Sequence, residues 1–377
     1  MAPVQILISA GEASGDMYAA RLATALRARA DVQLFGMGGS RMREAGVDLV
    51  ADCSEVALVG IVEIAKKYPA LRRVFKRLLN ESARRKPRLA ILTDFPGFHL
   101  RLARELKGQR VPCVYFVCPQ FWAWRPWRAN LVRRRFVRGL CIFPFEEEWY
   151  RSRGVKADFI GHPLVGNVAA KRTRNEFAAA FGLDASKPIV ALLPGSRSGE
   201  IAHHMPTLMQ ACRLIQRDRD VQFVLALAPG VSRSLIEPYL TADARVQVVE
   251  DSTYDALGAA DLSILSSGTA TVEAALMDAP MIVIYRLAPL TAAIARLLVR
   301  TPMFAMVNLI AGKRVVPELV QEDFTPARVA TEVTRLLDSP EARAQMRRGL
   351  AEVREKLGPP GAVERAADLI AGMLSQT

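Results

Sequence analysis

The sequence predicts an α/β protein of two doubly wound domains, each built on a parallel sheet that helices cover on both faces. Its 377 residues are enough for two domains of ordinary size. Short apolar runs alternate with amphipathic helical patterns along the chain, which is typical of β-α-β units. The alternation breaks at the Gly-His-Pro tripeptide of residues 161–163 and then begins again. We therefore expect one domain at residues 1–163 and a second at 164–357.

The expected strands are short apolar runs, and the expected helices lie between them. In the first domain the strands fall at residues 4–9, 32–36, 89–93, 111–117 and 139–143, with helices such as 18–29 and 99–106. In the second domain the strands fall at 189–193, 222–227, 246–249, 262–265 and 281–284, with helices such as 205–216 and 270–277.

The C-terminal segment, residues 358–377, is predicted to be a separate element. Its Gly-Pro-Pro-Gly start interrupts any helix, and residues 362–374 form a final one. We expect this helix to cross back onto the first domain. Exchange of such an element between two chains would give a homodimer.

The positive charge is concentrated in the first domain. The whole excess of +13 arises in residues 1–160, where 28 Lys and Arg stand against 15 Asp and Glu. A basic face of this kind suits a phosphorylated substrate, an anionic lipid or a nucleic acid. Because no helix-turn-helix, zinc or RNA-binding signature accompanies the charge, a nucleic-acid partner is not expected.

Composition also predicts a cytoplasmic protein without a metal site. No apolar run reaches the roughly 18 to 20 residues of a membrane span, and the N-terminus lacks the basic start of a signal peptide. The five cysteines show no C-x-x-C spacing, and the four histidines do not form a ligand set. The Asp-Arg-Asp tripeptide at 218–220 precedes a strand, so we interpret it as a surface turn and expect neither metal nor cofactor.

Two loops of the first domain carry candidate catalytic carboxylates. Ligands of open α/β sheets bind beyond the carboxyl ends of the strands, and both loops follow strands there. Glu12 lies between two glycines in Ala-Gly-Glu-Ala-Ser-Gly-Asp, where a carboxylate repels a pyrophosphate and suits hydroxyl groups. Asp94 follows the strand at 89–93 and is a candidate general base. We interpret Asp16, at the end of the first loop, as the N-cap of the following helix.

Two loops of the second domain suggest nucleotide binding. Leu-Pro-Gly-Ser-Arg at 193–197 places a glycine turn, a hydroxyl and an arginine at a helix start, and Ser-Gly-Thr at 267–269 opens another helix. Backbone N–H groups at such positions bind diphosphates. Glu273, about one turn into the second helix, could accept both hydroxyls of a ribose. The candidate nucleotide-binding residues are Gly195, Ser196, Arg197, Ser267, Gly268, Thr269 and Glu273.

Two segments of the first domain mix apolar and basic residues in the manner of a membrane surface. One is residues 58–77 and the other begins with Trp-Ala-Trp-Arg at 122–125. An ordinary helix with a charged outer face would explain the first segment equally well. The candidate membrane-facing residues are Val59, Ile61, Lys66, Arg72, Arg73, Phe75, Lys76, Trp122, Trp124 and Arg125.

These motifs, in this order, resemble the lipid-A-disaccharide synthase family. The likeness extends over nearly the whole chain, and its most specific parts are residues 10–16, 93–98, 119–125, 193–197, 267–273 and 308–312. The resemblance implies the GT-B fold, with two Rossmann-like domains facing a cleft. It also implies a peripheral enzyme of the inner membrane in a Gram-negative bacterium.

The reaction implied by the resemblance is an inverting glycosyl transfer. A UDP-2,3-diacylglucosamine donor and a 2,3-diacylglucosamine 1-phosphate acceptor would give lipid A disaccharide 1-phosphate and UDP. Asp94 matches the essential aspartate of the family and would be the base, and Glu12, Arg197 and Asn308 also match positions on which the family relies. We expect Glu12 to take part in catalysis and Arg197 to meet the diphosphate. Ser14 and Asn308 are candidates for the acceptor site or another part of the cleft. The nucleotide loops alone leave another GT-B enzyme that uses a UDP-sugar, an epimerase or a peptidoglycan-type transferase, as the alternative.

Overall fold

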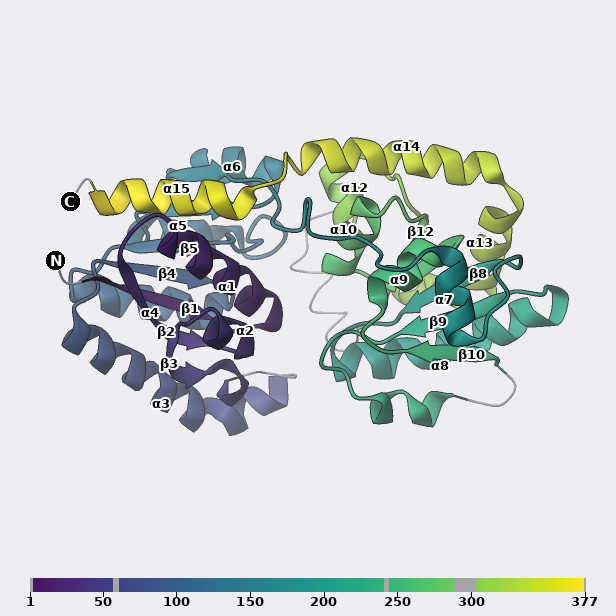
Figure 1. The fold of residues 1–377 in the computed structure, drawn as a ribbon, viewed down its shortest axis with the longest axis horizontal. Helices are drawn as coiled ribbons and strands as arrows, with labels where there is room; N and C mark the ends of the chain where they lie inside the picture. The colour runs from purple at the N-terminus through teal and green to yellow at the C-terminus, as the bar shows by residue number, and fades with distance from the viewer. Residues whose placement is uncertain (1–2, 57–60, 241–243, 288–302, 376–377) are drawn as a thin grey trace. The chain divides into compact units, whose positions relative to one another are not determined.

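The computed structural model describes residues 3–56, 61–240, 244–287 and 303–375, apart from the side chains of residues 13 and 61–67. The chain folds into two compact units, which we treat separately. Unit 1 is Met1–Val165 together with Leu357–Thr377, and unit 2 is Gly166–Lys356. Each unit contains a parallel sheet with helices packed on it (Figure 1), so the predicted α/β class is confirmed.

The sheet of unit 1 has seven parallel strands in the order β3-β2-β1-β4-β5-β6-β7. The strands are β1 (Val4–Ala10), β2 (Val32–Gly38), β3 (Asp48–Asp52), β4 (Leu89–Thr93), β5 (Cys113–Phe116), β6 (Arg138–Cys141) and β7 (Ala157–Phe159). The helices are α1 (Ala13–Arg27), α2 (Ser40–Glu44), α3 (Ile61–Arg85), α4 (Pro96–Gly108), α5 (Ala129–Arg135), α6 (Pro144–Arg151) and α15 (Ala362–Ser375), with short 3-10 helices η1 (Cys53–Glu55) and η2 (Pro126–Arg128).

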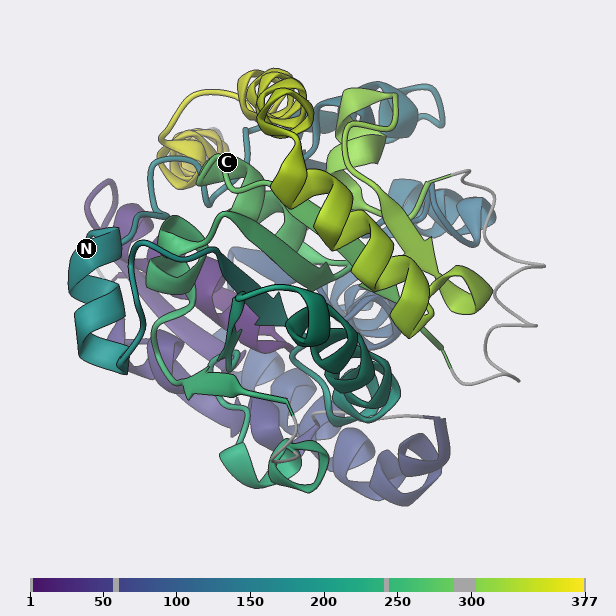
Figure 2. The same ribbon diagram turned by 90° about the vertical axis from the view of Figure 1, so that its right-hand side faces the viewer.

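The sheet of unit 2 has six parallel strands in the order β10-β9-β8-β11-β12-β13. The strands are β8 (Ile189–Leu193), β9 (Gln222–Ala226), β10 (Val246–Val249), β11 (Leu262–Ser266), β12 (Met281–Tyr285) and β13 (Glu318–Val320). Helices α8 (Ser198–Asp218) and α13 (Pro326–Asp338) pack side by side (Figure 2). The other elements are α7 (Arg174–Phe181), α9 (Thr253–Ala259), α10 (Thr269–Leu276), α12 (Met306–Ala311), α14 (Pro340–Lys356), η3 (Arg233–Leu235), η4 (Glu237–Tyr239) and η5 (Gln321–Asp323).

The predicted bounds of β4, β8 and β10 agree with those of the structure. Strands β4, β8 and β11 are buried along their whole length, as expected for strands covered on both faces. Strands β3 and β13 were not predicted. Both lie at a sheet edge, are short, and carry acidic residues, so they lack the continuous apolar run that reveals a central strand.

Both sheets reverse their strand order at one point, and the predicted site loops lie there. In unit 1 the reversal falls between β1 and β4, which are followed by the loops of Glu12 and Asp94. In unit 2 it falls between β8 and β11, which are followed by residues 194–197 and 267–268. Ligands of open α/β sheets bind beyond the strands' carboxyl ends at such a reversal. The topology therefore gives each unit one candidate site.

Helix α15 belongs to unit 1, although it follows the last helix of unit 2 in the chain (Figure 1). The backbone N–H of His162 donates to the carbonyl of Leu357 at 2.9 Å, and Arg365 donates to the carbonyl of Ile160 at 2.9 Å. Arg29 on α1 pairs with Asp368 on α15 at 2.5 Å. These contacts fix the C-terminal segment against α1 and against the residues that follow β7.

Candidate active site

The Asp94 carboxylate joins the two loops at the reversal point of unit 1. Asp94 follows β4 with a left-handed backbone (φ 53°). Its Oδ1 accepts the N–H of Gly11 at 3.0 Å, and its Oδ2 accepts the N–H of Glu12 at 3.3 Å. The carboxylate therefore lies over the first turn of α1, with Glu12 at the N-cap of that helix and Ser14 exposed in its first turn.

The two glycines of the first loop make room for Asp94 and Phe95. A Cβ atom on Gly15 would lie 1.6 Å from Oδ2 of Asp94, and a Cβ atom on Gly11 would lie 2.5 Å from the ring of Phe95. Neither separation is compatible with a side chain. The Gly-x-x-x-Gly spacing of residues 11–15 is thus explained by the close approach of the second loop, as at other sites where backbones meet.

The prediction that Asp16 caps its own helix is wrong. Helix α1 begins at Ala13, so Asp16 lies inside its first turn. Its buried carboxylate instead accepts backbone N–H groups of Gly39 (2.6 Å), Arg41 (3.2 Å) and Met42 (3.2 Å) at the start of α2. Asp16 therefore satisfies N–H groups at the N-terminus of another helix.

The backbone of Asp94 is held by two residues that sequence reasoning missed. Its carbonyl oxygen accepts the hydroxyl of Tyr115 at 2.8 Å and lies 2.9 Å from Nδ1 of His99. The other ring nitrogen of His99 lies 2.9 Å from the hydroxyl of Ser9. Burial lowers the pKa of His99 to about 4, so the ring is neutral, with Nδ1–H as donor to the carbonyl and Nε2 as acceptor from Ser9.

The environment of Asp94 favours its protonated form. Burial raises the pKa of Asp94 well above the ordinary aspartate range, and the nearby charges of Glu12 and Asp16 add to the rise. The N–H groups of Gly11 and Glu12 act in the opposite direction but do not offset the burial. A carboxylate with a raised pKa takes up a proton readily, which is the property that a general base requires.

Replacement of Tyr115 by phenylalanine is expected to lower kcat roughly three- to tenfold, by removal of one hydrogen bond of ordinary strength. The acidic limb of the pH–rate profile should stay in place, because Tyr115 acts on the backbone of Asp94 and not on its carboxyl. Steady-state kinetics measures both. Tyr150→Phe is the matched control, since Tyr150 is also a buried tyrosine that donates to a backbone carbonyl, that of Pro119. Equal losses in the two variants would contradict a role specific to Asp94.

In unit 2, the loop after β8 is held in shape by Glu200, a residue that sequence reasoning missed. Gly195 takes a positive φ of 135°, and the N–H of Ser196 donates to Oε2 of Glu200 at 3.0 Å. Arg197 pairs with the other oxygen of Glu200 at 3.4 Å and remains 59 % exposed. Glu200 takes the position that an anion would take at this helix start. An anionic ligand would therefore exchange with Glu200 on the same donors.

His204 ties this loop to the neighbouring strand. The buried ring donates from Nδ1 to the carbonyl of Pro194 at 2.6 Å, and its Nε2 accepts the N–H of Arg286 at 2.9 Å. Burial lowers the pKa of His204, in keeping with the neutral tautomer that this pair of bonds requires. His204 thus positions the loop and does not serve as a metal ligand.

The loop after β11 places an exposed glycine, Gly268, at the N-cap of α10. Gly268 has φ 153° and an exposed backbone, with no atom within 4 Å of the position that a Cβ would take, and Thr269 is exposed beside it. The Ser267 hydroxyl donates to the carbonyl of Phe304 at 2.7 Å. Within α10, Oε1 of Glu273 accepts the hydroxyl of Tyr254 at 3.0 Å, and burial raises the pKa of Glu273. Tyr254, on α9, had no signal in the sequence.

Asn308 is fully buried, and its amide is used within unit 2. Its Nδ2 donates to the carbonyl of Val316 (3.0 Å) and to Glu318 (2.8 Å), and its Oδ1 accepts the N–H groups of Val315 and Val316. Glu318 in turn accepts the N–H groups of Phe304 and Ala305. Asn308 and Glu318 therefore fix the segment that carries Phe304, the acceptor of the Ser267 hydroxyl.

Comparison with known sequences agrees with this arrangement of loops. The family model for lipid-A-disaccharide synthetase matches residues 6–369. The lipid-A-disaccharide synthase of Myxococcus xanthus is 42% identical over 375 residues, which cover 99% of this chain and 98% of that protein. The enzyme of the same name from Solibacter usitatus is 44% identical, with 96% of each chain covered. The chain belongs to the lipid-A-disaccharide synthase family. It is therefore a glycosyltransferase, as the resemblance implied.

Comparison with solved structures identifies the fold of this chain. A putative UDP-N-acetylglucosamine 2-epimerase from Listeria monocytogenes superposes with a TM-score of 0.68 at 14% identity and covers 100% of this chain and 98% of its own. A UDP-N-acetylglucosamine 2-epimerase from Neisseria meningitidis, bound to UDP-N-acetylglucosamine, superposes with a TM-score of 0.66 at 12% identity. The match covers 99% of this chain and 100% of that chain. A calicheamicin glycosyltransferase superposes with a TM-score of 0.62 at 16% identity, and the match covers 100% of both chains. The predicted GT-B fold is confirmed.

The tryptophan loop of unit 1 is anchored by a buried glutamate. Trp122 is half-buried, and its indole N–H donates to Oε1 of Glu146 at 2.9 Å, while Oε2 accepts the N–H groups of Ile142 and Phe143. Trp124 is half-buried as well. The exposed indole of the segment is that of Trp127, at 60%. Sequence reasoning selects Trp122 and Trp124 instead, because both lie in the most recognisable motif.

Replacement of Glu146 by glutamine is expected to flatten the dependence of stability on pH. Burial raises the pKa of Glu146 from 4.5 to about 7, so the folded chain binds one more proton than the unfolded chain in that window. Wild-type stability therefore falls as pH rises from 4.5 to 7, by on the order of 3 kcal/mol. Thermal unfolding of E146Q across this range should show the smaller change. The exposed neighbour Glu148→Gln should keep the wild-type slope; a wild-type slope in E146Q would contradict the assignment.

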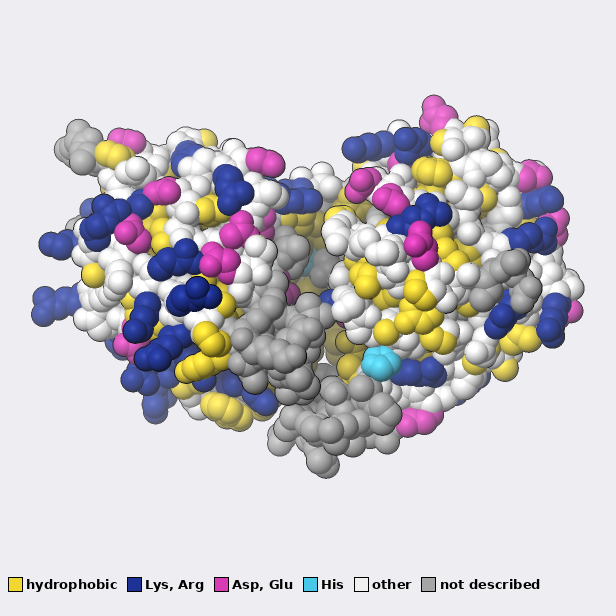
Figure 3. Space-filling model, turned by 90° about the horizontal axis from the view of Figure 1, so that it is seen from below, with side chains coloured by type: hydrophobic (Ala, Val, Ile, Leu, Met, Phe, Trp, Pro, Cys, Tyr) yellow, Lys and Arg dark blue, Asp and Glu magenta, His cyan; other side chains and the backbone are white. Residues whose placement is uncertain are grey.

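Helix α3 presents a basic outer face. Arg72, Arg73 and Lys76 are exposed, whereas Val74 and Leu78 are fully buried. The ring of Phe75 is half-buried against that of Phe98, 5.5 Å between centroids. On the face shown in Figure 3, Lys and Arg side chains gather over the part of the molecule that is unit 1 in Figure 1. Val59, and the side chains of Ile61 and Lys66, lie outside the described residues.

A transmembrane segment is not found among the helices that the structure describes: none combines the length and the apolar character that a membrane span needs. Arg125, the last of the predicted membrane-facing residues, is half-buried with its guanidinium over the Trp124 ring at 5.0 Å.

Proposed function

We propose that the chain transfers a 2,3-diacylglucosamine residue from UDP to the 6-hydroxyl of 2,3-diacylglucosamine 1-phosphate, with inversion at the anomeric carbon. The observation that carries this proposal is Asp94: a half-buried carboxylate with a raised pKa at the strand-order reversal of unit 1, in a chain of the lipid-A-disaccharide synthase family. The family name supplies the reaction, and the site supplies a base for it.

In this mechanism Asp94 removes the proton of the acceptor hydroxyl as the oxygen forms its bond to the anomeric carbon. The bond from that carbon to UDP breaks, and UDP leaves with the bonding electrons. Tyr115 and His99 hold the backbone of the base in place. Such fixed geometry is worth several orders of magnitude in rate when a reacting group must lie within about 3.5 Å of its partner.

We assign the donor's UDP to unit 2 and the acceptor to unit 1. The start of α10, with Gly268 and Thr269 exposed, and the start of α8, with Arg197 exposed, offer N–H donors and a cation to the diphosphate. Glu273 lies within α10, near enough to its start to accept ribose hydroxyls. The UDP-N-acetylglucosamine of the Neisseria meningitidis structure is a nucleotide sugar of the same class.

We further propose that the enzyme works at the cytoplasmic face of the inner membrane, because both substrates carry acyl chains. The exposed cations of α3 and the exposed indole of Trp127 support this location. Sedimentation with vesicles containing phosphatidylglycerol tests it. A homodimer by exchange of α15 is the corresponding assembly proposal, and light scattering that finds only monomers would remove it.

The experiment for the reaction is UDP release in detergent micelles. Wild-type enzyme is given UDP-2,3-diacylglucosamine alone, then with 2,3-diacylglucosamine 1-phosphate, and separately UDP-N-acetylglucosamine. Release that depends on the acylated acceptor supports the proposal. Conversion of UDP-N-acetylglucosamine without an acceptor would support the epimerase alternative instead, and release from unacylated sugars only would contradict the lipid substrates.

A further inference from the structure

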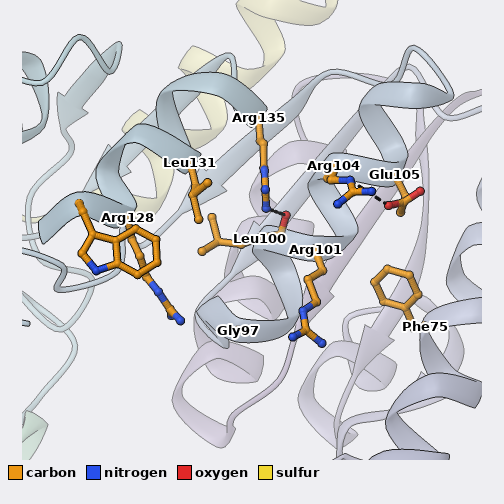
Figure 4. Close-up of a pocket in the computed structure, with 10 residues that line it drawn as sticks. Phe75, Gly97, Leu100, Arg101, Arg104, Glu105, Arg128, Leu131 and Arg135 are labelled. Carbon is orange, nitrogen blue, oxygen red and sulfur yellow. Dashed lines mark hydrogen bonds and ion pairs between the residues drawn. The ribbon is translucent and has the colours of Figure 1, made fainter. Parts of the chain in front are cut away.

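A hollow of about 480 Å³ opens in unit 1 between α4, α5 and residue 75 of α3 (Figure 4). Part of its lining is apolar and comes from three separate segments. These residues are Phe75, Leu100, Trp127 and Leu131, with the Trp127 indole exposed. An apolar wall of this kind is suited to the first carbons of an acyl chain.

The rest of the lining is strongly basic. Four arginines, Arg101, Arg104, Arg128 and Arg135, meet at the hollow, and Glu105 is the only acidic side chain among the described residues that line it. Glu105 contacts Arg104 at 3.4 Å, which leaves the remaining arginines without a carboxylate in the lining. A charge surplus of this size next to an apolar wall matches an anionic amphiphile.

Arg128 carries the clearest sign of a missing partner. Its guanidinium lies over the rings of Trp124 and Trp127 at 5.6 and 5.5 Å, and its Nε is buried without a hydrogen-bond partner in the described part of the chain. Burial and the neighbouring charges of Arg125 and Arg101 lower the pKa of Arg128. An anion in the hollow would offset the mutual repulsion of Arg128, Arg125 and Arg101, and it would do so beside a guanidinium that Arg128 already exposes to the lining.

The hollow lies at the start of α4, the helix that follows Asp94 in the chain. Gly97 lines it and lies three residues after Asp94, in the first turn of α4. Figure 4 shows Arg101 and Arg128 on either side of Gly97, and Arg101 lies one helical turn, about 6 Å, beyond it. Phe95 stacks on Phe98 at 5.4 Å, and Phe98 contacts Phe75 of the lining. A sugar with its hydroxyl at Asp94 therefore has the hollow beside it.

From these contacts we infer that the hollow binds the phosphate of the acceptor, between Arg101 and Arg128, together with the start of one acyl chain against Leu100 and Leu131. This inference rests on the proposed function, because it assigns the phosphorylated acyl sugar to the acceptor role. It adds the residues that would recognise the phosphate of this acceptor.

The test compares acceptors with and without the phosphate. For wild type, kcat/KM is measured with 2,3-diacylglucosamine 1-phosphate and with 2,3-diacylglucosamine, and then for Arg101→Gln/Arg128→Gln. Loss of two charge-assisted contacts should lower kcat/KM for the phosphorylated acceptor ~10- to 100-fold and so reduce the preference for the phosphorylated over the unphosphorylated acceptor, while the KM of the donor stays unchanged. Lys107→Gln/Arg134→Gln is the matched control, since both residues are exposed cations near the hollow that do not line it.

A second measurement does not depend on turnover. Quenching of tryptophan fluorescence, with Trp127 at the rim, gives the affinity for each acyl sugar directly. If wild type binds the phosphorylated sugar tightly and the double variant does not, the inference stands even where UDP release fails, and the proposed reaction alone is lost. Equal affinities in wild type and the double variant would overturn it. So would loss of binding to phosphatidylglycerol vesicles with an unchanged acceptor affinity, which would assign the hollow to a membrane lipid.

Discussion

Asp94→Asn is expected to lower kcat by a factor of ~10² to 10⁴ while substrate affinities change little. An asparagine fills the same space beside Gly15 but cannot take the acceptor proton, and positioned general bases contribute an acceleration of this size. The proposed UDP-binding loops lie in unit 2 and are not changed by this substitution, so we expect the affinity for UDP to stay the same. A UDP-binding titration beside the UDP-release assay separates the two effects.

The pH dependence gives the same prediction a second readout. Wild-type kcat/KM should fall as pH is lowered through the raised pKa of Asp94, because only the ionised carboxylate accepts the proton. The residual kcat/KM of Asp94→Asn should not show this fall at low pH. Asp31→Asn, which removes an exposed carboxylate of the same unit, should match wild type in both respects. If Asp94→Asn keeps a third or more of the wild-type rate, Asp94 is not the base.

Asp94→Asn, which is expected to lower activity, should raise stability relative to wild type as pH increases. A carboxyl with a raised pKa binds a proton in the folded chain at pH values where the unfolded chain has lost it, so wild type loses stability as pH rises above 3.8 toward the folded pKa. Asparagine does not ionise, so its stability does not fall with pH in this way. Its amide nitrogen cannot accept a hydrogen bond, so the variant loses one of the two bonds from Gly11 and Glu12 at every pH. The difference between the melting temperature of Asp94→Asn and that of wild type should therefore increase as pH rises. A constant difference would contradict a raised pKa.

Sequence reasoning located Asp94 and Glu12 because each stands beyond a strand, in a loop marked by glycine or proline. It failed where the structural partner is distant along the chain. Tyr115 lies in a run of apolar residues that is indistinguishable from core, and its hydroxyl bond to Asp94 depends on the pairing of β4 with β5. The edge strands β3 and β13 were missed for a related reason, since a strand with one open side needs no long apolar run.

The error at Asp16 has a more specific origin. The sequence predicts a helix at residues 18–29, and the carboxylate of Asp16 shortly before it is of the type that caps helix N-termini. The structure starts α1 at Ala13, with Gly15 inside its first turn, and the carboxylate of Asp94 occupies the space where a Cβ would lie. A glycine at this position costs helix propensity, but its lack of a Cβ leaves room for the Asp94 carboxylate.

Gly15→Ala should accordingly lower both activity and stability. Helix propensity alone predicts a gain of up to about 1 kcal/mol from this change. The new Cβ would lie 1.6 Å from Oδ2 of Asp94, and the backbones on both sides are held, Asp94 by Tyr115 and His99 and the loop by Asp94 itself. Steric crowding of this kind typically costs about 1 to 3 kcal/mol, so it outweighs propensity. A base displaced by about 1 Å loses on the order of 10²-fold in kcat.

Two further variants decide whether the loss comes from the Asp94 carboxylate. Gly372→Ala changes a glycine within α15 whose Cβ position is open, so it should leave activity unchanged and should not lower the melting temperature. In an Asp94→Gly background, which removes the carboxylate and tolerates the positive φ, Gly15→Ala should regain most of its lost stability. Chemical denaturation of the four variants of this cycle gives the coupling free energy. Additive effects would mean that Gly15 serves the helix alone, and the close contact between the two loops would then not be what fixes the catalytic carboxylate.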